Sequence, residues 1–241
     1  MDLPFPPISI GAPRAVEAKR AFAWFEQAMR LFKLAPVTWC ALGLITLATD
    51  LALQLLPGVG MLVSKIIVPL VECGMLIGAA ALDRSGPLSL RYAYAAFSAR
   101  PGAIAAIVIS ALAVFAAEAL TIYFVAGANL LASDSGLDQL SSAVVLGSIA
   151  IGALVSLPVA FVPFAALFSQ ASFAAAFASS MRGFALNVAP LMIFAALAVL
   201  LVALGLLLLG IGLIAVYPLL SAATYFAWKD IFPVTREAPR P

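Results

Sequence analysis

Long apolar stretches alternate with short polar connections along the chain, and the apolar stretches are long enough to cross a membrane. A transmembrane helix needs about 20 mostly apolar residues. The last apolar block, residues 190–228, is nearly twice that length, and Gly210-Ile211-Gly212 offers a turn that divides it. The pattern therefore predicts six spans, at residues 37–56, 61–82, 102–125, 142–168, 190–209 and 211–228.

Three shorter amphipathic segments precede the first, third and fifth spans, and they predict helices at the membrane surface. The second and third cover residues 88–99 and 172–186. A proline opens each span that follows, where its missing N–H would be unpaired in any case. The first segment carries on one face Ala18, Phe22, Phe25, Met29 and Phe32. Such helices either lie in the headgroup plane or cap the bundle. An amphipathic segment, a proline and a hairpin of two spans thus recur three times, which either triplication of one unit or convergence would explain.

The basic residues fall on one side of this predicted topology. Of the 13 Lys and Arg residues, all except Lys65 lie before the first span, between spans two and three, between spans four and five, or after the sixth. The positive-inside rule then places these connections and both termini in the cytoplasm. Residues 1–13 and 233–241 are predicted to be disordered, and residues 14–232 to form one membrane domain. Residues 1–13 lack the features of a signal peptide, so the first span is expected to act as the insertion signal.

The pattern of spans predicts an all-α, polytopic membrane protein of three hairpins, each preceded by an interfacial helix. The composition supports the membrane class. The chain is 65% apolar and 10% charged, with a mean hydropathy of +1.15, whereas soluble domains are about half apolar and about a quarter charged. The net charge of +2 is dispersed, which argues against a nucleic-acid partner and leaves the lipid bilayer as the expected one. There is no His, and Cys40 and Cys73 fall inside spans as packing residues. We expect no enzyme activity, no cofactor and no metal site.

Four ionisable residues lie within the predicted spans: Asp50, Lys65, Glu72 and Glu118. Charges in a span are expensive and mark either a function or a pair. Asp50, Lys65 and Glu118 are expected at a similar depth, about 8–10 Å below the outer surface at a rise of 1.5 Å per residue. We therefore expect Lys65 to pair with Asp50 across the first hairpin. The cluster is either a structural ion pair or a polar, outward-facing cavity that handles protons, a cation or a polar headgroup.

Two further patterns concern helix packing. Gly74 and Gly78 form a GxxxG motif on the face of span two opposite Lys65, and small residues at this spacing let another helix approach closely. Span two is therefore expected to be central in the bundle. Pro158 and Pro163 are expected to kink span four near its cytoplasmic half. Broken helices line substrate sites in some transporters, but proline is also tolerated in ordinary spans.

Two parts of the sequence carry a family resemblance. The first is the run PLVECG at 69–74 leading into ALDRSGP at 81–87, followed by Ala96-Phe97 and Arg100-Pro101. The second is the aromatic ending from Tyr217-Pro218 to Phe232. Together they resemble uncharacterised bacterial six-helix inner-membrane proteins, and distantly the membrane domain attached to some glycerophosphodiester phosphodiesterases. The resemblance spans residues 20 to 232 and implies a bacterial inner-membrane location and a six-helix fold, but no reaction.

The favoured functional hypothesis is a non-enzymatic organiser or accessory protein for membrane partners or lipids, with other membrane proteins or self-association open as its contacts. The alternative is a small transporter or permease with a polar intramembrane site from Asp50, Lys65, Glu72 and Glu118. A transporter should depend on Glu72, whereas an organiser should depend on Gly74 and Gly78.

Overall fold

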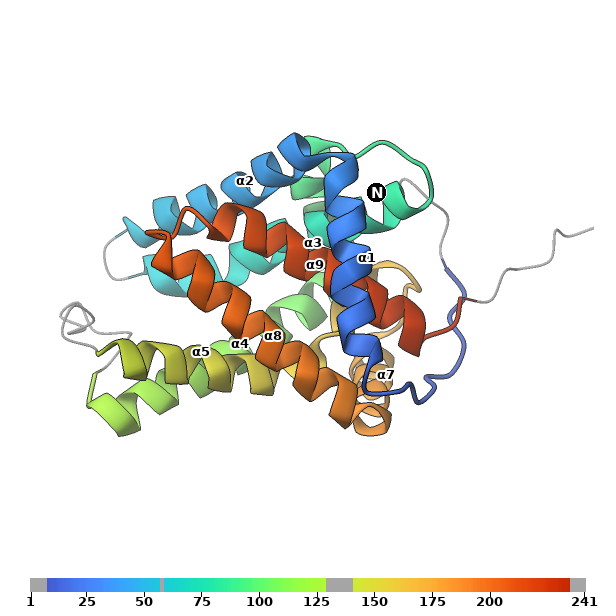
Figure 1. The fold of residues 1–241 in the computed structure, drawn as a ribbon. Coiled ribbons are helices and arrows are strands. Elements are labelled where there is room, and N and C mark those ends of the chain that lie inside the picture. The colour runs from blue at the N-terminus through green and yellow to red at the C-terminus, as the bar shows by residue number, and fades with distance from the viewer. Residues whose placement is uncertain (1–7, 57–58, 129–140, 235–241) are drawn as a thin grey trace, which may run out of the picture.

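Long helices lie side by side in the computed structural model, and shorter helices cross one end of them (Figure 1). The structure describes residues 8–56, 59–128 and 141–234. Within these ranges the protein is all-α, and its only β pairing is a single bridge between Ile10 and Val234. The elements in order are α1 (Arg20–Leu34), α2 (Pro36–Gln54), α3 (Gly60–Asp83), the 3₁₀ helix η1 (Leu90–Ser98), α4 (Pro101–Ala126), α5 (Ser142–Ser156), the 3₁₀ turn η3 (Leu157–Val159), α6 (Val162–Leu167), α7 (Phe173–Leu186), α8 (Val188–Leu207) and α9 (Leu213–Ile231).

Five helical segments in the described ranges are long and apolar enough to cross a membrane, which indicates a multi-pass integral membrane protein. They are α2, α3, α4, the run Ser142–Leu167 and α8. The predicted break in the last apolar block is confirmed: α8 ends at Leu207, and α9 begins at Leu213 after two left-handed residues, Leu209 (φ 55°) and Gly210 (φ 78°). The 19 residues of α9 end in a turn that carries Lys229 and Asp230, and α9 is not among the five.

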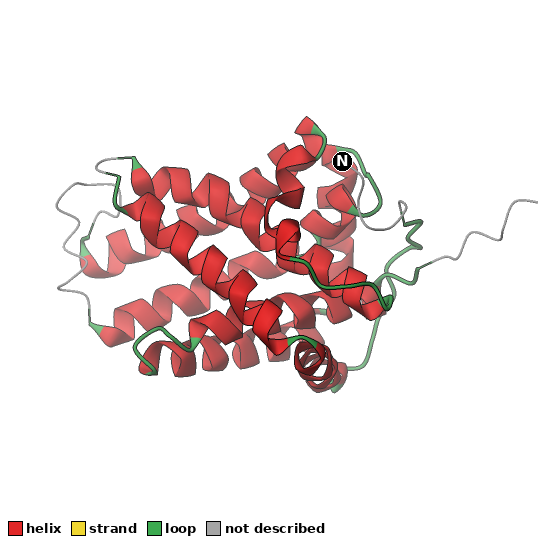
Figure 2. Ribbon diagram, turned by 90° about the horizontal axis from the view of Figure 1, so that it is seen from above, coloured by secondary structure: helices red, strands yellow, loops and turns green. Residues whose placement is uncertain are grey.

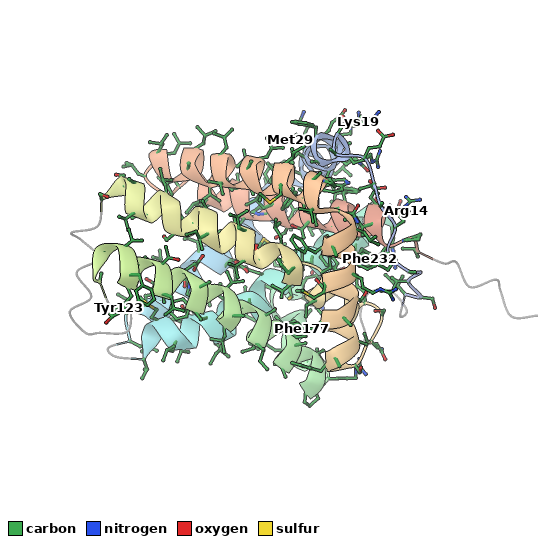
Figure 3. All side chains as sticks on the ribbon, turned by 90° about the horizontal axis from the view of Figure 1, so that it is seen from below. Arg14, Lys19, Met29, Tyr123, Phe177 and Phe232 are labelled. Atoms are coloured by element: carbon green, nitrogen blue, oxygen red, sulfur yellow. The ribbon has the colours of Figure 1, made fainter. Side chains whose placement is uncertain are left out.

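The elements that the sequence predicts to be interfacial gather at one end of the long helices. Figure 1 shows α1 crossing α9 there, with α7 near by, and Figure 2 shows the long helices running lengthwise away from this end. Figure 3 places Arg14, Lys19, Phe177 and Phe232 at the same end and Tyr123 at the other. We call the end formed by α1, η1, α7 and the last turn of α9 the basic end.

The first predicted amphipathic segment forms helix α1, but its buried face is turned away from the predicted one, of which only Phe25 and Phe32 are partly buried against the core. The core side of α1 is formed by Ala21, Trp24, Ala28 and Leu31, and it packs on α9. Phe22 and Met29, on the predicted apolar face, are 58% and 41% exposed. The reason is tertiary: the small Ala21 and Ala28 let α1 approach α9 closely, and Trp24 fills the space between them.

The second interfacial segment is a 3₁₀ helix, and it occupies the GxxxG face of α3. A side chain added at Gly74 would overlap the carbonyl oxygen of Tyr92, and one added at Gly78 would come within 2.6 Å of the Leu88 side chain. The predicted close approach is therefore made by a segment of this chain rather than by another span. The prediction that this span is central agrees with α3, half of whose residues are buried.

The two prolines of the fourth predicted span break the helix. Helix α5 ends at Ser156, and η3 and a turn follow before α6 begins at Val162. The fully buried Ser180 of α7 bridges the break, since its hydroxyl donates to the Pro158 carbonyl (2.7 Å) and accepts from the Phe161 N–H (3.1 Å). One serine thus satisfies two backbone groups that would otherwise be unpaired in a dry interior.

The chain near the two termini is more ordered than the sequence predicted. Ile8 is 6% exposed and its N–H donates to the Phe168 carbonyl (2.8 Å), and the Gly11 N–H donates to the Pro233 carbonyl (2.9 Å). The prediction of disorder is therefore wrong for residues 8–13, because these backbone bonds tie them to the basic end. Residues 1–7 and 235–241 lie outside the described ranges.

We expect the Gly74→Ala substitution to destabilise the protein, because its methyl group would overlap the Tyr92 carbonyl and force η1 away from α3. Overpacking of this kind costs about 1–3 kcal/mol in the free energy of unfolding. Thermal denaturation in detergent would measure it. Gly147→Ala on α5 is the matched control, since no atom lies within 4 Å of the added methyl group. Equal melting temperatures for the two variants would contradict this packing.

Candidate functional site

A cavity of about 400 Å³ lies between α3, α4, α9 and the broken α5–α6 run. Its walls are mostly apolar, from residues such as Pro69, Leu76 and Ile107. Three ionisable side chains predicted from the sequence line it: Lys65 and Glu72 from α3, and Glu118 from α4. The structure therefore brings three of the four intramembrane charges to one cavity.

A second cavity of about 230 Å³ adjoins the first and shares Lys65, Phe115 and Glu118 with it. Its remaining lining includes Gln54, the last residue of α2, and Met61, at the start of α3. These positions lie at the end of the bundle opposite the basic end. The two cavities therefore follow one another from that end towards the middle of α3, with the three shared residues between them.

The predicted ion pair between Lys65 and Asp50 does not form. Asp50 lines neither cavity, and its Oδ2 accepts a hydrogen bond from Gln54 Nε2, one turn further along α2 (2.8 Å). The Lys65 ammonium instead lies 5.4 Å from the centre of the Phe115 ring on α4, a cation–π distance. Depth along the helices can be expected from residue spacing, but the preference of Lys65 for Phe115 depends on how α3 is rotated against α4.

Glu118 lies in a niche made by a glycine of the neighbouring helix. A side chain at Gly152 of α5 would overlap the Glu118 carboxylate, so the Glu118 side chain would have to move to make room for it. Sequence reasoning did not single out Gly152. A glycine within an apolar helix gives no sign of its partner, because that partner is set by the packing of α4 against α5.

The acidic residues in the membrane differ sharply from those at the basic end. At the basic end, every acidic residue that the structure describes has an ion pair: Glu17 with Lys19, Glu26 with Arg30, Asp83 with Lys229, and Asp230 with Arg14 and Arg20. Within the same described ranges, no Lys or Arg nitrogen lies within 4.0 Å of a carboxylate oxygen of Asp50, Glu72 or Glu118. The carboxylates at the basic end therefore have ion pairs, whereas Glu72 and Glu118, which line the cavity, have none in the described ranges.

Hydroxyl groups complete the lining, and most of them were missed by sequence reasoning. Tyr217, Ser221 and Thr224 of α9 face the cavity, together with Ser110 of α4 and Ser156 of α5. The spacing of 217, 221 and 224 places three polar groups on one helical face of an apolar segment, which was the available signal. Helix α9 therefore forms a wall of the site.

Within the described ranges, no three side chains among Cys, Asp and Glu lie together as a metal site would need. Comparisons with protein-family models, curated proteins and solved structures give no match. The resemblance to six-helix inner-membrane proteins therefore stays a prediction, and the site has to be interpreted from its own geometry.

The clearest titration outside the membrane helices belongs to Asp230, whose side chain is 10% exposed. Burial would raise the pKa of this carboxyl, but hydrogen bonds from Arg20, Trp24 and Arg14 outweigh it and lower the pKa below 3.8. A lowered folded-state pKa gives stability that is present above the unfolded-state pKa and is lost as the pH falls through the folded-state pKa.

We therefore expect Asp230→Asn to lower the free energy of unfolding at pH 7 by about 1.5 kcal/mol, the lower end for charged hydrogen bonds, because both arginines are partly exposed. The difference from the wild type should shrink as the pH falls below 3.8. Chemical denaturation in detergent across this pH range would test it. Glu17→Gln is the control, since its pair with Lys19 is largely exposed and should contribute little. A constant difference at all pH values would contradict the assignment.

Proposed function

We propose that the protein is a small transporter or permease that binds a polar solute or headgroup in its intramembrane cavity. The observation that carries this proposal is that Lys65, Glu72 and Glu118 line one cavity without an ion pair in the described ranges. A charged residue at the centre of a membrane helix costs about 2.5–3.5 kcal/mol on insertion scales. Side chains retained at such a cost, and turned towards a cavity, are suited to a bound ligand.

The competing interpretation was a structural ion pair that fixes helix register. Such a pair needs a short contact between the two charges and further hydrogen bonds to offset their desolvation. Lys65 has neither with Asp50, which is bound by Gln54 instead. The geometry therefore favours the cavity interpretation over the structural one.

The organiser hypothesis relied on the close-packing face of α3. Because η1 covers Gly74 and the preceding Leu88 covers Gly78, that face is not available to a partner protein. The role of an organiser for membrane partners or lipids stays a prediction, but these two glycines no longer support it. This is why we place the transporter first.

We further propose a topology of six spans in three hairpins, with α9 as the sixth span and the basic end in the cytoplasm of a bacterial inner membrane. The pairs α2 with α3, α4 with α5 and α8 with α9 are each in contact, as hairpins require. The part of α9 before Lys229, residues 213–228, extends about 24 Å at the usual rise, enough to cross most of the hydrocarbon core. The positive-inside rule supports the orientation.

Reporter fusions should distinguish six spans from five. With six, green fluorescent protein fused after Pro241 should fluoresce, and alkaline phosphatase at the same place should be inactive, because the fusion point is cytoplasmic. Fusions after Gly210, between α8 and α9, should give the reverse pattern and serve as the matched control. An active phosphatase at Pro241 would show that α9 does not cross the membrane.

Native mass spectrometry of the protein extracted gently from its own membrane tests the proposed function. We expect the wild type to carry a stoichiometric small molecule or lipid, and Glu72→Gln to lose it, because the substitution removes the carboxyl group that faces the cavity. The folded fraction, measured by thermal denaturation, should stay nearly unchanged.

Glu26→Gln is the control for this experiment, since it makes the same chemical change at an exposed ion pair of α1. Identical adducts on the wild type and Glu72→Gln would count against a ligand site at Glu72. A stoichiometric protein partner that survives Glu72→Gln would return the organiser hypothesis to first place.

A further inference from the structure

The hydroxyl groups that line the larger cavity present mainly acceptor oxygens. Ser110, Ser156 and Thr224 each donate their hydrogen to a backbone carbonyl of their own helix, at 2.7, 2.8 and 2.8 Å. A hydroxyl oxygen has two lone pairs, so each of these groups can still accept a hydrogen bond. A ligand in the cavity would therefore meet three acceptors that have no hydrogen left to give.

Beside the cavity, a proline interrupts the backbone hydrogen bonds of α3. Pro69 lies inside α3 and lines the cavity, and it lacks the N–H that would bond the carbonyl of Lys65 one turn earlier. The hydroxyls of Tyr217 and Ser221 can donate as well as accept, and they stand beside this acceptor-rich lining. Hydrogen bonding in the cavity thus favours a ligand that donates.

The charges point in the same direction. Two carboxylates, Glu72 and Glu118, face one ammonium group, that of Lys65, and no other basic side chain lines the cavity among the described residues. Lys65 and Glu118 lie where the two cavities meet, whereas Glu72 lines the larger cavity alone, two helical turns from Lys65. The inner part of the cavity therefore holds a carboxyl group whose only basic neighbour among the described lining residues is Lys65, two turns away.

The position of Lys65 shows that the Phe115 ring in the cavity wall can contact a cation. Its ammonium is directed at the Phe115 ring, which is 7% exposed and lines both cavities. A ring face attracts a cation more strongly when water is excluded. A volume of about 400 Å³ is far larger than a bare metal ion needs, and within the described ranges no three side chains among Cys, Asp and Glu gather as metal ligands.

We propose that the cavity takes an organic cation, an ammonium or guanidinium group on a small apolar body, with the charge at Glu72 and the body against the apolar wall. This rests on the proposed function and names the class of its ligand. Lys65, at the junction of the two cavities, is a resident cation that lowers the affinity for a second one and so tunes selectivity.

Cys73 offers a reporter inside the same cavity, since it lines the wall next to Glu72 and is 2% exposed. In a Cys40→Ala protein, reconstituted in lipid nanodiscs, it is the single thiol. Three methanethiosulfonates of similar size would be compared, carrying a trimethylammonium, a sulfonate or a neutral hydroxyl group. In each reaction the Cys73 sulfur forms a mixed disulfide and methanesulfinate leaves, and intact-mass spectrometry follows the rate.

Each rate is divided by the rate of the same reagent with a free thiol, so that only the influence of the cavity remains. We expect the cationic reagent to exceed the anionic one by at least about tenfold, as electrostatic focusing in a low-dielectric cleft can provide. Glu72→Gln should reduce this preference severalfold, and the matched Glu26→Gln should leave it unchanged. Lys65→Met should increase the preference, which keeps the test valid if Glu72→Gln does not fold.

The outcomes separate this inference from the proposed function. If the neutral reagent reacts but the cation has no advantage over the anion, or if Lys65→Met lowers that advantage, the cation class is wrong while a solute cavity remains. If no reagent modifies the folded protein even at alkaline pH, where more of the Cys73 thiol is the reactive thiolate, although all modify it after unfolding, the cavity is closed to solutes. That result would overturn the proposed function and this inference together.

Discussion

The position of α9 depends on two carboxylates at the basic end of the bundle. Asp83, the last residue of α3, accepts hydrogen bonds from the Tyr225 hydroxyl (2.7 Å) and the Lys229 ammonium (2.6 Å). Asp230 of α9 accepts from Arg20 (2.6 Å) and from the Trp24 indole (3.0 Å) of α1. These charge-assisted bonds fix α9 against α3 on one side and α1 on the other. Because Tyr217, Ser221 and Thr224 of the same helix form a wall of the cavity, this anchor also sets the shape of the site.

Helix α3 carries the other half of the site through two faces with different chemistry. Its Gly74 and Gly78 face is filled by η1, and its Lys65 and Glu72 face opens on the cavity. Tight packing on the first face holds the helix in one rotation about its axis. This fixed orientation matters because Lys65 and Glu72 lie two turns apart on the same face of α3. If the helix turned about its axis, both side chains would leave the cavity together. The packing at Gly74 and Gly78 therefore helps to hold Lys65 and Glu72 in the cavity.

The sequence predicted the helices, the break before α9 and the effect of Pro158 and Pro163, because these follow from local apolar length and backbone chemistry. It did not predict the partner of Lys65 or the buried face of α1. Asp50 and Lys65 have matching depths, but side-chain pairing depends on helix rotation, which periodicity alone does not determine in a helix that is apolar on all sides. The hydroxyls of α9 were recognisable by spacing, whereas the niche at Gly152 depends on a contact between α4 and α5 that no local pattern contains.

The distribution of ion pairs argues for a cavity kept for function rather than stability. At the basic end, where water lowers the cost of charge, each described acidic residue has a basic partner. In the apolar helices, where an ion pair would offset the largest desolvation cost, Glu72 and Glu118 have no ion pair in the described ranges. The ammonium of Lys65 is directed at the Phe115 ring instead. An ionisable residue without a partner in a membrane helix costs free energy. Selection for stability alone would therefore remove these carboxylates, and their presence in an acceptor-rich cavity favours a ligand that supplies the missing positive charge.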